Sequence, residues 1–141
     1  MNRIQTLVSL GQSLWYDNIQ RHLLEGGELA SMISRGEIRG VTSNPSIYHN
    51  AIAKTNDYDQ ALFPMALAGW EAETIFWQLA KEDIQRTCDL FLPMYDETRG
   101  GDGFVSLEVH PDLAHDDIAT LAQAKLLWER IDRPNLMIKI P

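Results

Sequence analysis

Short runs of apolar residues recur along the chain, and four of them have the length and pattern of β-strands. Apolar residues in these runs either alternate with polar ones, as in a strand with one buried face, or form a short continuous stretch, as in a fully buried strand. A polar or charged residue stands near the carboxyl end of every run. The four predicted strands cover residues 13–17, 38–44, 104–109 and 136–140.

The segments between these strands carry apolar residues three or four positions apart, which is the spacing of an amphipathic helix. The predicted helices are 28–35, one opened by Pro45, a long region over 57–95 broken at Gly69, and one capped by Asp116 or Asp117. On the long region, the residues expected to be buried are Ala72, Phe76, Leu79, Ala80, Ile84, Cys88, Phe91 and Tyr95. On the last helix they are Leu121, Ala124, Trp128 and Ile131.

Strands that alternate with helices predict an α/β fold with parallel strands and right-handed crossovers. An open doubly wound sheet and a closed barrel both have this order. With 141 residues and a hydrophobic content of 45%, the chain has the size of one domain or of part of one.

Composition and charge argue against several classes of partner. A formal net charge of -8, without a local Lys/Arg cluster, disfavours binding to nucleic acid. The N-terminus lacks the apolar segment of a secretion signal, and no run approaches the ~18 apolar residues of a membrane span. Cys88 is the only cysteine, so no intrachain disulfide can form. We expect a soluble, unprocessed, cytoplasmic protein without membrane or nucleic-acid partners.

Candidate chemical groups stand near the carboxyl ends of the predicted strands, where parallel α/β folds form their sites. They are Asp17 on the first strand, Thr42 and Asn44 on the second, Glu108 on the third and Lys139 on the fourth. Because side chains alternate between the two faces of a strand, Glu108 is expected to face away from the helices that cover Val105, Leu107 and Val109.

Each charged or amide residue in this set also has a structural interpretation. Asp17 and Asn44 could cap the helices that follow them, and Glu108 could form an ion pair. Lys139 could extend its ammonium group to solvent at the end of the strand. Yet an ammonium between Ile138 and Ile140 is costly to bury unless it is paired or deprotonated, and the neutral amine is the form that attacks a carbonyl to make a Schiff base.

Metal and nucleotide cofactors are not expected. The segment 110–117 contains two histidines and three aspartates, but their spacing matches none of the usual zinc or calcium patterns. Gly100, Gly101 and Gly103 follow a predicted helix rather than a strand, unlike the glycines of a dinucleotide-binding loop.

Read together, the four strand ends resemble the transaldolase family of Schiff-base aldolases. The matching stretches are S-L-W-Y-D at 13–17, G-V-T-S-N-P-S-I at 40–47, V-S-L-E-V at 105–109 and L-M-I-K-I-P at 136–141. They occur in the order of the family and extend over nearly the whole chain.

This resemblance implies a (β/α)8 TIM barrel that acts in the pentose phosphate pathway without a cofactor. The family reaction moves a dihydroxyacetone unit from sedoheptulose 7-phosphate to glyceraldehyde 3-phosphate, giving erythrose 4-phosphate and fructose 6-phosphate. The resemblance makes Lys139 the Schiff-base lysine, Asp17 the acid/base at the C4 hydroxyl, and Glu108 the residue that moves protons through a bound water. Asn44 and Thr42 are expected to bind the substrate.

The length of the chain departs from the family pattern, because such a barrel takes ~250 residues. We therefore expect residues 1–141 to be the N-terminal half of a barrel domain, with four parallel strands, inactive alone and prone to form a homo-oligomer through its open edges. Two alternatives stay open: cleavage of the fructose-6-phosphate aldolase type, and a non-catalytic α/β fragment for binding or assembly.

Overall fold

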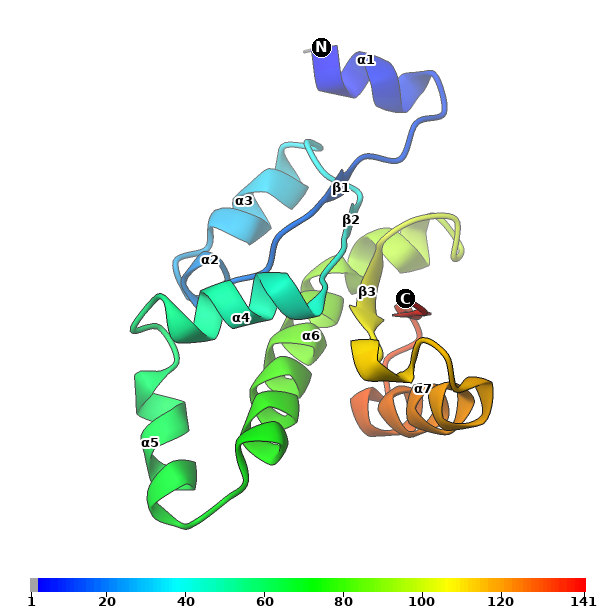
Figure 1. Cartoon of the computed structure of the whole chain (residues 1–141). Helices are drawn as coiled ribbons and strands as arrows, with labels where there is room; N and C mark the ends of the chain where they lie inside the picture. Colours follow the sequence, from blue (N-terminus) through cyan, green and yellow to red (C-terminus); the bar gives the residue numbers. More distant parts are fainter. Residues whose placement is uncertain (1–2) are drawn as a thin grey trace.

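Strands and helices alternate through the computed structural model of the protein, which describes residues 3–141 (Figure 1). The strands are β1 (Trp15–Tyr16), β2 (Gly40–Val41), β3 (Phe104–Glu108) and β4 (Leu136–Lys139). The helices are α1 (Arg3–Ser9), α2 (Arg21–Glu25), α3 (Glu28–Ser34), α4 (Pro45–Ala53), α5 (Asp59–Leu67), α6 (Ala72–Glu97) and α7 (Asp117–Ile131), with a 3-10 turn, η1, at Pro111–Leu113.

The four strands form one parallel sheet in the order β1-β2-β3-β4. Strands that follow one another in the chain are therefore neighbours in the sheet, as consecutive strands of a (β/α)8 barrel are. A doubly wound sheet instead reverses its strand order at a switch point. The α/β prediction and the parallel sheet are confirmed, and the arrangement is that of part of a TIM barrel.

One face of the sheet is covered by α6 and α7, and the main core lies between this face and the two helices. The outward residues Val105 and Leu107 of β3, and Val109 just after the strand, are at most 2% exposed, as predicted. They belong to the same buried cluster as residues of α6 and α7, which include Ala80, Ile84, Cys88, Phe91, Leu127 and Ile131. Burial at this interface fixes which face of each strand remains for chemistry.

The predicted helical region over 57–95 consists of α5 and α6, separated where expected at Gly69, whose φ is 80°. Most of the predicted stripe on α6 is buried or half-buried. Ala72 is the exception: it is exposed because it is the first residue of the helix, beyond the contact with the sheet. A tight turn then leads into β3, and Gly103 has a φ of 81° and no room for a side chain, since a Cβ would lie 2.6 Å from the backbone nitrogen of Tyr95.

The buried face predicted for the last helix is partly wrong. Leu121 and Trp128 are 56% and 46% exposed, whereas Thr120, Leu127 and Ile131 are the buried residues of α7. Both sets have helical spacing, and the two faces are neighbours on the same helix. Packing against β3 and β4, rather than apolar spacing, decides which of them is covered.

Two helices were not predicted, and all four strands are shorter than predicted, β3 and β4 by one residue and β1 and β2 by several. The five residues of α2 are too few to show an apolar period, and α1 has no buried residue and projects from the rest of the chain (Figure 1). β1 and β2 have two residues each, because ladder pairing in the structure extends only over Trp15–Tyr16 and Gly40–Val41. Within residues 3–141, none of the helices has both the length and the apolar composition required to cross a membrane.

Candidate active site

The register of the sheet brings the predicted site residues to one face. Glu108 lies opposite Lys139, and Val41 lies opposite both Tyr16 and Val105. Paired residues of parallel strands point to the same side, and side chains alternate along each strand. Since Val105 and Leu107 face the helices, Glu108 and Lys139 occupy the opposite, inner face, as the sequence predicted.

Trp15 and Gly40 form part of the same inner face, towards the amino ends of β1 and β2. They are partners in the ladder, and a Cβ on Gly40 would lie 2.6 Å from the indole ring of Trp15. The ring therefore occupies the space above the glycine backbone. The Trp15 ring therefore lies next to the polar groups, on the side of the amino ends of the strands.

Lys139 meets three oxygen acceptors on this face. Its Nζ lies 3.0 Å from Glu108 Oε2, donates to the backbone oxygen of Ser43 at 3.0 Å, and donates to Thr42 Oγ1 at 3.3 Å. An ammonium group has three N–H donors, so all three can be used. The interpretation of Glu108 as an ion-pair partner is confirmed, and Lys139 is paired rather than simply extended into solvent.

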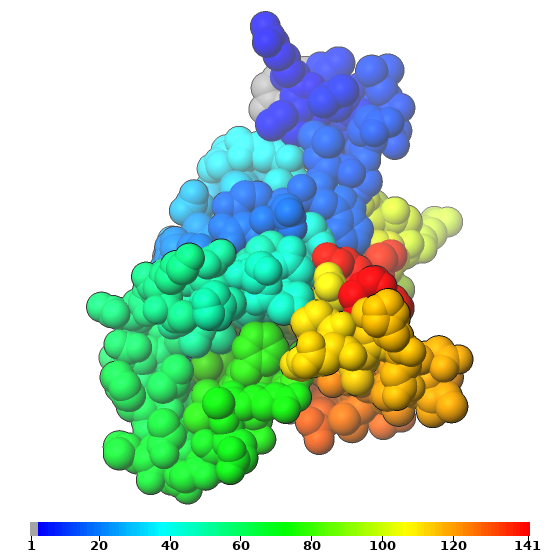
Figure 2. Space-filling model, viewed as in Figure 1, coloured from blue at the N-terminus to red at the C-terminus, as the bar shows by residue number. Residues whose placement is uncertain are grey.

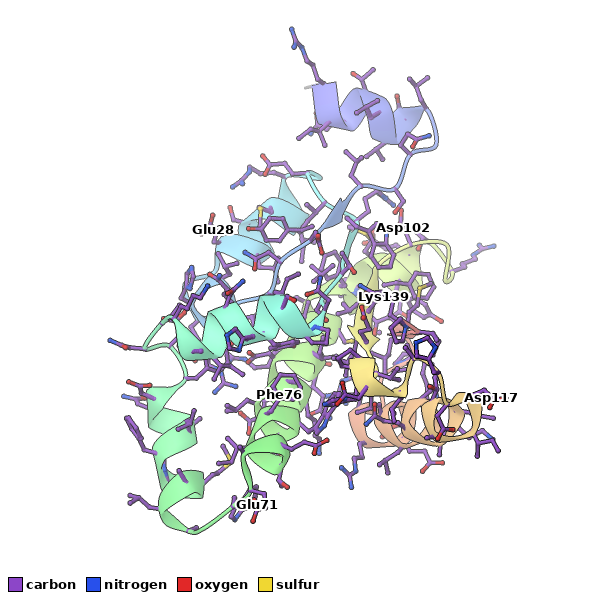
Figure 3. All side chains as sticks on the ribbon, viewed as in Figure 1. Glu28, Glu71, Phe76, Asp102, Asp117 and Lys139 are labelled. Carbon is purple, nitrogen blue, oxygen red and sulfur yellow. The ribbon has the colours of Figure 1, made fainter. Side chains whose placement is uncertain are left out.

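The amine of Lys139 nevertheless remains accessible. Its side chain is 38% exposed, compared with 14% for that of Glu108. In Figure 2 the C-terminal residues lie at the surface, beside α4 and the segment that follows β3. Figure 3 places Lys139 towards the arrowhead end of β3, while Asp102 lies at the other end of that strand, where it accepts hydrogen bonds from Ser13 and Arg39. A carbonyl compound could therefore reach Lys139 from the carboxyl-end side of the sheet.

Hydroxyl groups just after β2 and on β3 hold the oxygen atoms around Lys139 in place. Ser106 Oγ donates to Thr42 Oγ1 at 3.0 Å, and Ser43 Oγ donates to the backbone oxygen of Ser106 at 2.8 Å. Ser43 and Ser106 are 0% and 4% exposed. Neither was among the predicted site residues. Ser106 could have been predicted, because it lies two residues before Glu108 and so shares its face of the strand. Nothing in the sequence indicated the contact of the Ser43 backbone with Lys139.

Asn44 caps α4, so its structural interpretation is confirmed. Its Oδ1 accepts a hydrogen bond from the backbone nitrogen of Ile47 at 2.9 Å, and Pro45 occupies the first turn. The Nδ2 group makes no hydrogen bond within residues 3–141. The cap holds the amide plane with its donor side free, which is compatible with the predicted contact to a substrate hydroxyl.

Asp17 follows β1 directly, and its interpretation as a helix cap is wrong. The N-cap position of α2 is Gln20. One residue beyond the Tyr16–Val41 pair, Asp17 is in register with Thr42 and so belongs to the inner face. It is exposed and forms no ion pair or hydrogen bond through its side chain in the part of the chain that the structure describes. Its carboxylate is available to a ligand, but no contact joins it to Lys139.

The buried thiol is not part of this site. Cys88 is 0% exposed on α6, and burial, with a smaller contribution from Asp89, raises the pKa of its thiol to about 12. A thiol with this pKa stays protonated near neutral pH and is a poor nucleophile. Lys139 is therefore the candidate nucleophile that the geometry supports.

Comparison with known proteins gives the same family along nearly the whole chain. The family model described as Transaldolase/Fructose-6-phosphate aldolase matches residues 14–141. A transaldolase of Thiobacillus denitrificans is 45% identical over 141 residues, which are all of this chain and 39% of the relative. Transaldolases of Trichodesmium erythraeum and Thermobifida fusca are each 44% identical, over 99% and 98% of this chain and 37% and 38% of their own lengths. The chain thus spans about two fifths of the length of these curated relatives, and it belongs to the transaldolase/fructose-6-phosphate aldolase family.

Proposed function

We propose that this chain supplies the Schiff-base lysine and the acid/base carboxylates of a transaldolase. Such an enzyme transfers a dihydroxyacetone unit from one sugar phosphate to another. The observation that carries the proposal is the accessible amine of Lys139, 3.0 Å from the carboxylate of Glu108, on the inner face of a parallel sheet. Family membership and the transaldolase names of the relatives support it.

The first half of the reaction forms and uses an imine at Lys139. The neutral amine attacks the C2 carbonyl of a ketose phosphate, and loss of water gives the protonated imine. Asp17 takes the proton of the C4 hydroxyl, the bond between C3 and C4 breaks, and the shorter aldehyde leaves. The electron pair of that bond passes to the protonated imine, which becomes an enamine.

The second half reverses these steps with another aldehyde. The enamine carbon attacks the carbonyl of the acceptor, Asp17 returns the proton to the new hydroxyl, and water hydrolyses the imine to regenerate Lys139. Glu108 is proposed to move the protons that imine formation and hydrolysis require, and its distance of 3.0 Å from the amine supports this role. Asn44, through its free Nδ2, and Thr42 are proposed to bind hydroxyl groups of the three-carbon unit.

The imine itself accepts electrons, so the proposed reaction requires no metal or organic cofactor. The sugar phosphates carry a dianionic group that needs a cationic seat. On the inner-face positions that the register defines between residues 15 and 139, Lys139 is the only lysine or arginine. We therefore expect the phosphate seat to lie outside these positions.

The compartment and assembly of the protein are also proposals. The charge of -8 argues against nucleic acid as a partner, and a single buried thiol is compatible with the reducing cytoplasm. Association into a homo-oligomer remains a prediction.

Borohydride trapping tests the proposed function directly. A complete barrel protein that includes this chain is incubated with fructose 6-phosphate, reduced with sodium borohydride, and digested for mass spectrometry. We expect a covalent adduct at Lys139 and none in Lys139→Arg, because a guanidinium stays protonated and cannot form an imine. Lys125→Arg, on the exposed face of α7, is the matched control and should trap as well as the unchanged chain.

The mass of the adduct distinguishes the outcomes. A three-carbon adduct means that the C3–C4 bond was cleaved. In a separate sample without borohydride, transfer of the three-carbon unit to erythrose 4-phosphate distinguishes transaldolase chemistry from simple aldolase cleavage. A six-carbon adduct means imine formation without cleavage. Absence of any adduct at Lys139 in the complete, folded protein would contradict the proposal and favour a non-catalytic α/β module.

A further inference from the structure

The segment that carries Asp17 leaves the sheet just before that residue. The ladder between β1 and β2 ends at Tyr16, whose backbone oxygen accepts a hydrogen bond from Thr42 N at 3.0 Å. Asp17 makes no side-chain contact of its own with a polar partner in the described chain. The direction of its carboxylate therefore depends on how the turn between β1 and α2 is held.

That turn ends at a buried arginine. Arg21 is the first residue of α2, and its side chain is 7% exposed. Its Nε donates to Asp83 Oδ1 at 2.9 Å, and its Nη2 lies 3.0 Å from Glu82 Oε2. The guanidinium carbon also lies 4.7 Å from the centre of the Tyr58 ring. Both carboxylates come from α6, the helix that packs on β3.

Asp83 is committed to this cluster through both of its oxygens. It is 0% exposed, its Oδ1 accepts from Arg21, and its Oδ2 accepts from the hydroxyl of Tyr58 at 2.7 Å. Burial raises the pKa of Asp83, while the hydrogen bond from Tyr58 and the charge of Arg21 oppose that increase. The cluster thus joins the turn after β1 to α6 and to the segment before α5.

Stability alone is a weak reason for such a cluster. Removing two charges from water offsets much of their attraction, and well-packed apolar residues in the same place often give an equally stable protein. What an ion pair supplies in addition is geometry, because the Arg21 guanidinium fits a carboxylate in few orientations. Only three residues lie between Asp17 and Arg21, so a fixed Arg21 restricts the short turn between them.

We propose that Arg21 is a positioning residue that, through Asp83, fixes the turn between β1 and α2 and so directs Asp17 to the inner face. The role of Asp17 in the reaction rests on the function proposed above, but the effect of Arg21 on the turn does not. α6 also packs on β3, which carries Glu108. The cluster therefore ties the positions of both proposed carboxylates, Asp17 and Glu108, to the same helix.

Three variants of the full chain separate positioning from stability. Arg21→Met removes the charge and keeps an apolar side chain of similar length. A triple variant, Arg21→Met with Tyr58→Phe and Asp83→Leu, replaces the whole buried cluster by apolar groups, so that no buried polar group is left without a partner. Arg133→Met is the matched control, since Arg133 pairs with Asp89 on α6, away from this turn.

The readout is the 15N order parameter of residues 17–20, measured by NMR, with residues 104–108 and 136–139 as internal references. We expect a fall from about 0.85 to below about 0.6 at residues 17–20 in both Arg21 variants, with no change in the reference strands or in Arg133→Met. The triple variant should keep the thermal stability of the unchanged chain. Unchanged order parameters at residues 17–20 in the triple variant, or loss of folding in both Arg21 variants, would overturn the proposal.

Trapping with dihydroxyacetone and borohydride, in a complete barrel protein that carries the same variants, tests the proposed role of Asp17. Imine formation with this ketone needs Lys139 but no cleavage of a C–C bond, so it should be unchanged in the Arg21 variants. With fructose 6-phosphate, the ratio of three-carbon to six-carbon adducts should fall at least tenfold. If dihydroxyacetone is not trapped at all, the proposed function fails, while the order parameters still decide the role of Arg21.

Discussion

Asn135→Ala is expected to destabilise the fold, because Asn135 immediately precedes β4 and anchors it. Asn135 is 0% exposed, and its Nδ2 donates to the backbone oxygens of Cys88 and Gly103, both at 2.9 Å. Its own backbone oxygen accepts from Val105 N at 3.0 Å. The side chain therefore connects β4 to α6 and to the start of β3, and it helps to set the register that pairs Glu108 with Lys139.

The expected cost follows from these contacts. Two buried hydrogen bonds contribute about 0.5–1.5 kcal/mol each, so their loss costs about 1–3 kcal/mol. The small cavity left by the amide adds to this cost. Against it, Oδ1 has no hydrogen-bond partner in residues 3–141, and its removal relieves a buried unsatisfied acceptor. We expect a net loss of about 2 kcal/mol.

Urea unfolding, followed by far-ultraviolet circular dichroism at 25 °C, measures this loss. With a slope of about 2 kcal/mol per molar urea, the midpoint should fall by about 1 M without a change of slope. A change below about 0.5 kcal/mol would refute the reasoning, because it would mean that the two amide hydrogen bonds contribute nothing net.

Asn135→Asp is the matched control, since it has nearly the same size but places a carboxylate against two carbonyl oxygens. Burial should raise the pKa of this introduced carboxyl in the folded chain above its unfolded value. Its contribution to stability is then greatest at low pH and is lost as the pH rises through the folded pKa. We expect Asn135→Asp to be less stable than Asn135→Ala at pH 7, and the difference to narrow towards pH 5.

Two further predictions concern the cap of α4 and the buried thiol. Asn44→Ala should cost about 1 kcal/mol of unfolding free energy, since it removes the acceptor for Ile47 N, whereas Asn44→Asp should keep the cap. Both variants should weaken trapping of fructose 6-phosphate if the free Nδ2 binds substrate. Because burial raises the pKa of Cys88 from 9.0 to about 12, its stabilising contribution is complete below pH 9 and is lost as the pH rises towards 12. The unfolding free energies of the unchanged chain and of Cys88→Ala are measured between pH 8 and 11 by urea unfolding. Below pH 9 their difference should be constant, and above pH 9 the unchanged chain should lose more unfolding free energy than Cys88→Ala.

The sequence by itself determined the order of the strands and the identity of the main candidate residues. Alternation in 104–109 assigned Val105 and Glu108 to opposite faces, and an ammonium between Ile138 and Ile140 marked Lys139. The cap at Asn44 was predictable because the cap and Pro45 act on the next turn of the same helix. These features depend on neighbours a few residues away, so they can be recognised along the chain.

Other features depend on contacts between distant segments, and only the tertiary structure decided them. Apolar spacing on α7 allowed more than one buried face, and packing on the sheet left Leu121 and Trp128 exposed. The buried pair of Arg21 and Asp83 joins residues 62 positions apart. Lys139 likewise meets Glu108 and the backbone of Ser43 only because the strand register brings three strands together. Side-chain period and capping chemistry are local, whereas register and partner choice are set by the packing of the whole chain.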